Sequence, residues 1–266
     1  MIKVAVTGGA GRMGSLIAGL VTDTAGLRLG AVLEREGHPS VDRDAGEMFG
    51  ASVAGIKVSD DVAKAMEECD VLIDFTSAEV SMKNIRAVTL AGKAIVVGST
   101  GFTPDQKREI SSLPGARVFL AANMSVGMNV LFRLVNEAAK LLGDDFDVEI
   151  VETHHRFKKD SPSGSALRLA EAVASALKRD PESDFVYGRE GIVGERTKKE
   201  IGIHAVRAGD VVGDHTVIFG ALGERLELTH KASSRETFAR GAIRAALWIP
   251  GQKPGVYEML DLLGLK

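Results

Sequence analysis

The chain has 266 residues, of which 45% are hydrophobic and 26% are charged, and its formal net charge is −3. This length is sufficient for one large domain or two modest ones, and the apolar content argues against disorder along the whole chain. The net negative charge argues against a general nucleic-acid-binding surface, which is normally basic.

The first 120 residues alternate between short apolar runs and amphipathic runs. The apolar runs have the composition of strands buried on both faces, and they are Ile2–Thr7, Leu29–Glu34, Val71–Phe75, Ala94–Gly98 and Arg117–Leu120. The stretches between them predict helices at Gly11–Thr22, Ser59–Glu68, Ser77–Ala91 and Thr103–Ser111, with Ser59 and Thr103 as N-caps. This alternation predicts an α/β fold with a Rossmann-type, doubly wound parallel sheet.

The first strand and the single cysteine bear on localisation. The apolar run at residues 1–7 is shorter than that of a signal peptide and has no basic leader before it. No run approaches the roughly eighteen apolar residues of a membrane span. Cys69 cannot form an intrachain disulfide, and we interpret it as a small buried residue rather than a catalytic thiol. We therefore expect a cytoplasmic protein with no membrane partner.

A glycine-rich turn follows the first strand and opens the first helix. Its pattern is Gly9-x-Gly11-x-x-Gly14, in which the glycines are expected to allow the tight turn, the close approach of a pyrophosphate and close helix packing, respectively. Glu34 ends the second strand, where a carboxylate can accept hydrogen bonds from ribose hydroxyls, and Arg35 can meet a 2′-phosphate. We predict NADH, NADPH or both as cofactor; the alternative is that Glu34 and Arg35 only solvate a strand end.

Two later turns end strands at positions where parallel sheets bind ligands. They are Gly98-Ser99-Thr100 and Ala121 to Ser125. Thr100 or Asn123 is a candidate to hydrogen-bond the nicotinamide carboxamide. The alternative is that both are ordinary βα turns.

The pattern changes after residue 121. Helices are predicted at Val126–Leu142, Gly164–Lys178 and Arg235–Trp248, a strand at Phe146–His154, and three further β-like runs between residues 200 and 232. We therefore expect a dinucleotide-binding domain over residues 1–126. Residues 127–235 are expected to form a smaller α+β substrate domain with an antiparallel or mixed open sheet.

Residues 152–166, ETHHRFKKDSPSGSA, concentrate proton donors beside a helix start. His154 titrates near neutral pH, and Lys158 can supply a second proton or a fixed charge. Ser163, Gly164 and Ser165 are predicted cap and first-turn residues whose amides can receive a carboxylate. The alternative is one structural and one solvated histidine, since His154 and His155 need not share a face. No third ligand falls at a usual spacing and the other histidines are scattered, so we predict no metal site.

These segments together resemble the dihydrodipicolinate (4-hydroxy-tetrahydrodipicolinate) reductase family. The segments GGAGRMG, LERE, GSTGF, AANMSVGMNV and ETHHRFKKDSPSG occur in the family's order, and the resemblance covers essentially the whole chain. Two departures are Ser165 in place of threonine, which keeps the hydroxyl, and Met124 where phenylalanine is common.

The resemblance implies a role for each matching residue. His154 corresponds to the proton donor and acceptor, and Lys158 to the second proton donor. The substrate-binding positions are His155, Gly164 and Ser165. The cofactor-binding positions are Gly8, Gly9, Ala10, Gly11, Arg12, Met13, Glu34, Arg35, Gly98, Ser99, Thr100, Ala121, Ala122, Asn123 and Met124.

The resemblance also implies the reaction. The expected substrate is a small dicarboxylate, a cyclic imine that loses its 4-hydroxyl as water and is reduced by NAD(P)H on the diaminopimelate route to lysine. It further implies a homotetramer and a tail, residues 236–266, that returns to the nucleotide domain. The alternatives are a two-domain dehydrogenase acting on an amino acid such as aspartate or homoserine, and a non-catalytic NAD(P)H-binding regulator.

Overall fold

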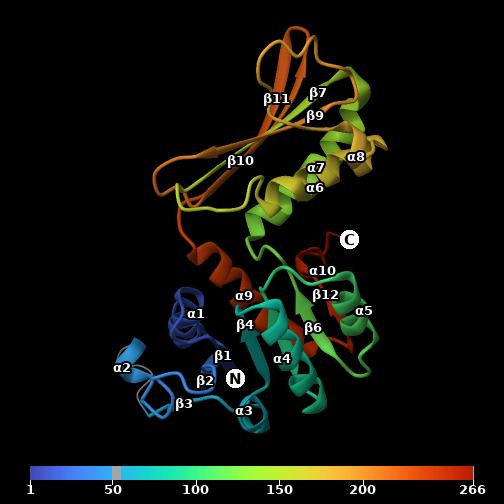
Figure 1. Ribbon diagram of the computed structural model, residues 1–266. Helices are drawn as coiled ribbons and strands as arrows, with labels where there is room; N and C mark the ends of the chain where they lie inside the picture. The colour runs from blue at the N-terminus through green and yellow to red at the C-terminus, as the bar shows by residue number, and fades with distance from the viewer. Residues whose placement is uncertain (50–54, 266) are drawn as a thin grey trace. The chain divides into compact units, whose positions relative to one another are not determined.

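The computed structural model describes residues 1–49 and 55–265 (Figure 1). The chain forms two compact units. The first unit comprises Met1–Ser125 and Glu236–Lys266, and the second comprises Val126–Arg235. The polypeptide therefore leaves the first unit once, builds the second from a continuous segment, and returns.

Within the described residues of the first unit, seven strands form one parallel sheet in the order β12-β6-β5-β4-β1-β2-β3. The strands are β1 (Ile2–Thr7), β2 (Leu27–Leu33), β3 (Val58–Ser59), β4 (Val71–Asp74), β5 (Ala94–Val97), β6 (Arg117–Leu120) and β12 (Gly255–Tyr257). The predicted parallel sheet is confirmed. Because the chain runs outward from β1 in both directions, the strand order reverses between β1 and β4, which is where such sheets bind ligands.

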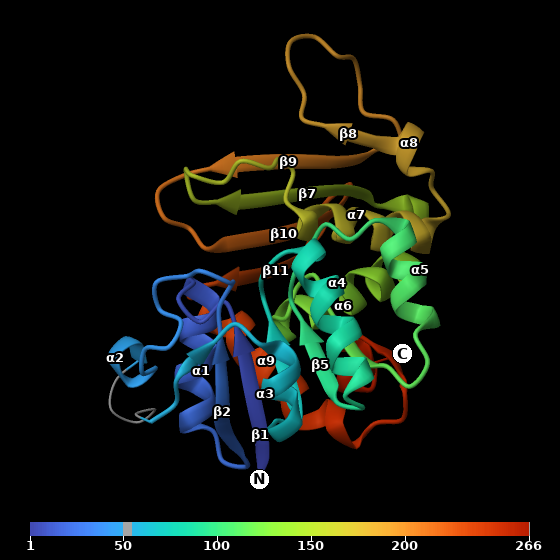
Figure 2. The ribbon, with the colours of Figure 1, turned by 60° about the horizontal axis from the view of Figure 1, so that its bottom comes forward.

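Helices cover both faces of this sheet (Figure 2). They are α1 (Arg12–Asp23), α2 (Gly46–Phe49), α3 (Val62–Glu68), α4 (Ala78–Leu90), α5 (Pro104–Ser112), α9 (Glu236–Trp248) and α10 (Met259–Leu263), with a 3₁₀ turn, η3, at Ile249–Gly251. The tail helix α9 packs on α1 and reaches β4 and β5, whereas α3 and α4 pack together. On the second face, Met66, Met82 and Ile85 bury their side chains against Leu72 and Ile95.

One of the two predicted caps is wrong. Ser59 pairs with Leu33 as part of β3, so its backbone is extended and cannot begin a helix. Helix α3 begins later, and the carboxylate of Asp61 accepts from the backbone N–H of Lys64 at 3.0 Å. The cap at Thr103 is confirmed, because its hydroxyl and the side chain of Gln106 satisfy each other's backbone amides.

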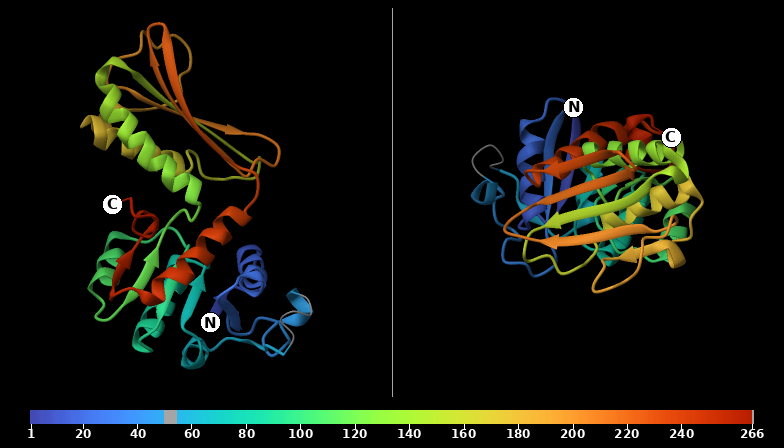
Figure 3. Two further views of the ribbon diagram at one scale, coloured as in Figure 1. Left: turned by 180° about the vertical axis from the view of Figure 1, so that it is seen from behind. Right: turned by 90° about the horizontal axis from the view of Figure 1, so that it is seen from above.

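Within the described residues of the second unit, five strands form a mixed sheet in the order β11-β10-β7-β9-β8 (Figure 3). The strands are β7 (Asp147–His154), β8 (Phe185–Tyr187), β9 (Ile201–Arg207), β10 (Gly213–Ala221) and β11 (Glu224–Ala232). The helices are α6 (Val126–Leu142), α7 (Gly164–Leu177) and α8 (Pro181–Asp184), with a 3₁₀ turn, η2, at Gly143–Asp145. β10 and β11 form the expected antiparallel hairpin, but β9 pairs in parallel with β7 rather than with β10.

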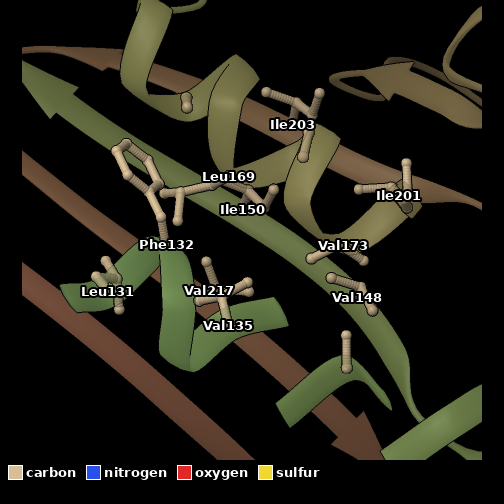
Figure 4. Close-up of a cluster of buried hydrophobic side chains, with 14 of the residues drawn as sticks. Leu131, Phe132, Val135, Val148, Ile150, Leu169, Val173, Ile201, Ile203 and Val217 are labelled. Carbon is tan, nitrogen blue, oxygen red and sulfur yellow. The ribbon is translucent and has the colours of Figure 1, made fainter. Parts of the chain in front are cut away.

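Helices α6 and α7 cover one face of the mixed sheet (Figure 4). Strand β7 alternates in burial, so Val148 and Ile150 enter the core against Phe132 of α6. Each such buried side chain stabilises the fold by about 1.5–3 kcal/mol. The same period of two places Glu152 and His154 on this helix-covered face, at the end of the strand.

Candidate active site

Glu152 is the centre of a polar cluster at the end of β7. Its side chain is fully buried, and one of its oxygens lies 2.5 Å from Nδ1 of His154. Arg207, at the end of β9, donates to both carboxylate oxygens at 2.8 and 2.9 Å. The backbone N–H of Ser163 donates to the same carboxylate at 3.0 Å. The prediction that this amide is free to receive a ligand carboxylate is therefore wrong.

The charge states of this cluster follow from its contacts. Burial by itself raises the pKa of Glu152, but the hydrogen bonds from Arg207 and His154 outweigh it and hold that pKa below its usual value. Burial lowers the pKa of His154, and the adjacent Glu152 carboxylate only partly opposes this. An ionised carboxylate can only accept, so Nδ1 of His154 is the donor. The ring is then neutral near pH 7, with the lone pair of Nε2 available.

Gly213, the first residue of β10, lies beside that nitrogen. A Cβ at this position would lie 3.0 Å from Nε2 and 3.4 Å from Cδ2 of His154. Any side chain here would therefore crowd the reactive edge of the ring. The sequence does not single out Gly213, because its position depends on the pairing of β10 with β7.

His215 lies beside the motif, so the prediction that it is one of the scattered histidines is wrong. Its ring lies edge-on to that of His154, with ring centroids 5.1 Å apart, and its Nε2 lies 3.0 Å from the Ser163 hydroxyl. That hydroxyl caps α7 by accepting from the N–H of Ala166. Burial, with the nearby His154, lowers the pKa of His215 to about 4. His215 is therefore a neutral, buried support for the cluster.

This shift predicts a loss of stability in mild acid. Because the unfolded chain binds a proton at His215 near the ordinary histidine pKa and the folded chain does not, stability falls as pH drops through that value towards about 4. We expect His215 to contribute about 2 kcal/mol to the stability difference between about pH 7.5 and about pH 5. Urea unfolding of the wild type and of His215→Asn at both pH values measures this difference in the free energy of unfolding. An equally steep loss in the variant would contradict the assignment.

Lys158 and His155 complete the motif on the loop after β7. Nζ of Lys158 lies 3.0 Å from the Asp160 carboxylate, and its side chain is 19% exposed. Nδ1 of His155 is buried and has no hydrogen-bond partner among the residues that the structure describes. Gly164 has open space where a Cβ would project. A charged donor, an unsatisfied imidazole nitrogen and an uncrowded helix start are thus available in this unit.

In the first unit the predicted glycine turn joins β1 to α1, but the tight turn lies at Gly8 rather than at Gly9 as predicted. Gly8 holds the left-handed backbone conformation, with φ of +63°, that the tight turn requires. Gly9 instead allows close packing on β2, since a Cβ there would lie 2.3 Å from a Val32 methyl. At Gly14 a Cβ would lie 2.1 Å from the Gly8 carbonyl oxygen, so this glycine permits the close approach of α1 to the turn.

This turn borders a cavity of about 490 Å³. Its lining residues are Gly8, Ala10, Gly11, Arg12, Met13, Gly14, Glu34, Arg35, His38, Phe75 and Thr76. Helix α1 follows Gly11, which has no side chain to cap it, so the first-turn amides can face an anion. The Glu34 carboxylate accepts from the Ala10 amide at 2.8 Å. The predicted pyrophosphate turn and the Glu34–Arg35 pair therefore border the same space, and they suit a dinucleotide.

A second cavity, of about 410 Å³, shares Gly8, Glu34, Arg35 and Thr76 with the first. It adds the apolar side chains of Leu33, Val62 and Val80 and the charged groups of Glu36, Asp60 and Lys83. Apolar walls with a few polar groups suit an adenine ring. These residues come from three separate elements, so no local pattern in the sequence predicts that they meet.

The two later turns line neither cavity. Gly98 packs on the Phe75 ring, and the buried Ser99 hydroxyl accepts from Ser81 at 2.8 Å. Met124 is 1% exposed, and a Cβ on Gly241 of α9 would lie 1.8 Å from its carbonyl oxygen. The Asn123 side chain accepts from the Ser125 amide. The nicotinamide-side role of residues 98–100 and 121–124 stays a prediction.

The described part of the chain holds neither a metal-binding cluster nor a membrane-spanning helix. Residues 1–49 and 55–265 contain no group of three His, Cys, Asp or Glu side chains arranged to hold a metal ion. The helices in those ranges also include none with the length and apolarity to span a membrane.

Sequence models of the dihydrodipicolinate reductase family match both parts of the chain. The amino-terminal model matches residues 2–124 and the carboxy-terminal model matches residues 127–263. The chain belongs to the dihydrodipicolinate reductase family. The carboxy-terminal model includes most of the tail that packs in the first unit, so the two models together cover nearly the whole chain. The resemblance predicted from the sequence is confirmed.

Members of the family are similar over the full chain. The 4-hydroxy-tetrahydrodipicolinate reductase of Geotalea daltonii is 54% identical, with 100% of both chains covered. That of Anaeromyxobacter dehalogenans is also 54% identical, over 100% of this chain and 99% of the relative. Among solved structures, dipicolinate-bound dihydrodipicolinate reductase from Paenisporosarcina sp. TG-14 has a TM-score of 0.74 at 23% identity, over 98% of each chain. The diaminopimelate dehydrogenase of C. glutamicum, at 16% identity and a TM-score of 0.55 over 98% of this chain and 93% of its own, shares the fold alone.

Proposed function

We propose that this chain is an NAD(P)H-dependent reductase that converts 4-hydroxy-tetrahydrodipicolinate to tetrahydrodipicolinate with loss of water, on the diaminopimelate route to lysine. Family membership supports the reaction class. The observation that carries the proposal is the Glu152–His154 pair beside Arg207, in a unit that also holds Lys158. These groups supply the positive charge and the proton transfer that a dicarboxylate imine requires.

The first unit is proposed to hold the nucleotide. The α1 amides and the Gly8–Gly14 turn would receive the pyrophosphate, and Glu34 and Arg35 the adenosine ribose. Gly98–Thr100 and Ala121–Met124 are proposed as nicotinamide-side contacts, on the strength of the family resemblance. When bound, the reduced nicotinamide supplies the hydride.

The second unit is proposed to hold the substrate and to move the proton. A dianion beside His154 would favour the protonated ring, because an adjacent negative charge raises a histidine pKa. Nε2 is the atom that exchanges the proton, since Nδ1 stays committed to Glu152. Lys158 is proposed as the second proton donor, and His155, Gly164 and Ser165 as carboxylate-binding positions. Glu152 and Arg207 are positioning residues that act through His154.

The two alternatives are less well supported. A dehydrogenase for homoserine, a monocarboxylate, would have little use for a lysine, an arginine and two histidines in one cluster, whereas aspartate, a dicarboxylate, is distinguished by the assay below. A non-catalytic nucleotide-binding regulator would not need the buried Glu152 that holds His154 in one tautomer.

A coupled assay tests the proposal directly. The synthase that makes 4-hydroxy-tetrahydrodipicolinate would supply it in situ, and nicotinamide absorbance would be followed with NADH and with NADPH. Substrate-dependent oxidation of either nucleotide supports the proposal. No oxidation with this substrate, together with turnover of aspartate or homoserine, would overturn it in favour of the dehydrogenase.

The ribose role of Glu34 gives a further prediction. Glu34→Ala is expected to weaken the binding of NADH roughly tenfold and that of NADPH by a smaller factor. The reason is that a carboxylate accepts a hydrogen bond from the 2′-hydroxyl but repels a 2′-phosphate. Dissociation constants from nucleotide fluorescence measure both. Equal weakening would instead mean that Glu34 acts only through its hydrogen bond to the Ala10 amide.

We also propose a cytoplasmic homotetramer, as the family resemblance implies. On the face of the five-stranded sheet opposite α6 and α7, Val206 of β9 is 43% exposed, which leaves an apolar side chain available to a second copy. Light scattering of the purified protein tests the assembly.

A further inference from the structure

His38 lies in the loop after β2 and lines the cavity beside the glycine turn. The ring is held by its own loop. The backbone N–H of Ser40 donates to Nδ1 at 3.2 Å, and the Ser40 hydroxyl lies 2.6 Å from the same nitrogen. Ser40 itself is only 6% exposed, and the backbone N–H of His38 donates to the Arg35 carbonyl at 3.1 Å. The loop therefore fixes where this ring lies.

These contacts determine which ring nitrogen carries the hydrogen. A backbone N–H can only donate, so Nδ1 of His38 must accept. The hydrogen of the neutral ring is then on Nε2, the nitrogen that Ser40 does not occupy. His38 therefore presents a fixed N–H donor rather than a ring of either tautomer.

The charges around His38 suit an anion. Among the described residues that line this cavity, Arg12 and Arg35 are cations and Glu34 is the one acid. Both oxygens of Glu34 are engaged by backbone amides, at 2.8 Å from Ala10 and 3.2 Å from Arg35. Two backbone donors thus partly compensate the charge of this carboxylate, while three side-chain donors border the same space.

Glu34 and Arg35 also lie where this cavity meets the second one, with its apolar walls. If an adenine occupies the apolar cavity and a pyrophosphate the glycine turn, the ribose between them lies at Glu34 and Arg35. The 2′ substituent is the part of the nucleotide that differs between NADPH and NADH. It would lie beside the loop that carries His38.

We propose that His38 is a hydrogen-bond donor to the 2′-phosphate of NADPH and sets how well this chain uses NADPH relative to NADH. The proposal rests on the proposed function, since it assumes that the first unit binds these nucleotides. A phosphate monoester accepts strongly from an imidazole N–H and an adjacent guanidinium, whereas a 2′-hydroxyl gains little from them.

A pair of variants tests it. In His38→Asn the side-chain oxygen can still accept from Ser40 but the distal donor is lost; in His38→Gln an N–H donor is kept near the position of Nε2. Dissociation constants for NADH and NADPH would be measured by fluorescence on the full-length protein. We expect His38→Asn to raise the NADPH constant about tenfold and to leave the NADH constant within about twofold. His38→Gln should recover most of the NADPH affinity.

Each other outcome overturns the inference. Equal weakening of both nucleotides would place His38 against the part they share, and unchanged binding of both would remove it from the site. A wild-type protein that binds NADH but not NADPH would leave no 2′-phosphate contact to explain. A wild-type protein that binds neither nucleotide would overturn the proposed function as well, which separates the two failures.

Discussion

Replacing both His154 and Lys158 by alanine is expected to lower kcat by at least about 10⁴-fold while changing the NADH dissociation constant by less than about twofold. General acid–base groups typically contribute about 10²–10⁴-fold each. Both residues lie in the second unit, whereas the residues that border the two cavities proposed for the nucleotide lie in the first. Steady-state turnover and nucleotide fluorescence, measured on the same preparations, separate chemistry from cofactor binding.

Lys159→Ala is the matched control for this double variant. Lys159 is exposed and adjacent to Lys158, so it tests whether positive charge on the loop is sufficient. We expect turnover to stay within about threefold of the wild type, because an exposed lysine makes little difference to a buried cluster. If the double variant loses NADH binding along with turnover, the motif has been assigned to the wrong ligand.

The fold was largely predictable because its strands have a strong local signal. Strands buried on both faces read as continuous apolar runs, which located β1, β4, β5 and β6. β3 and β12 were missed, because strands of two and three residues have no periodicity to detect. β12 also pairs with β6 from a distant part of the chain.

The site was predictable only where its residues are adjacent in sequence. The motif located His154 and Lys158, and the alternation of β7 after Val148 and Ile150 is the signal that would have placed Glu152 and His154 on one face. Arg207 reaches Glu152 across 55 residues of sequence, and only the parallel register of β9 with β7 brings it there.

Glu152→Gln is expected to lower kcat about a hundredfold and to move the limb of the pH–rate profile that reports His154 to lower pH. The carboxylate raises the pKa of His154 through its hydrogen bond and its charge, so its removal leaves burial and the cations Lys158 and Arg207 to lower that pKa further. The amide can also donate to Nδ1, which would favour the wrong tautomer. kcat/KM measured across the pH range in which histidine titrates gives the shift.

Glu149→Gln is the matched control, because Glu149 is a second ion-paired glutamate on the same strand. Its carboxylate accepts from Arg189, Arg196 and His204 on the opposite face of β7. Both variants remove a carboxylate from a network of cations and should lose stability, because each leaves buried or half-buried positive charge without its partner. Only Glu152→Gln should move the pH limb. If Glu149→Gln moves it equally, or if Glu152→Gln lowers activity with no movement at all, Glu152 supports the fold rather than the proton transfer at His154.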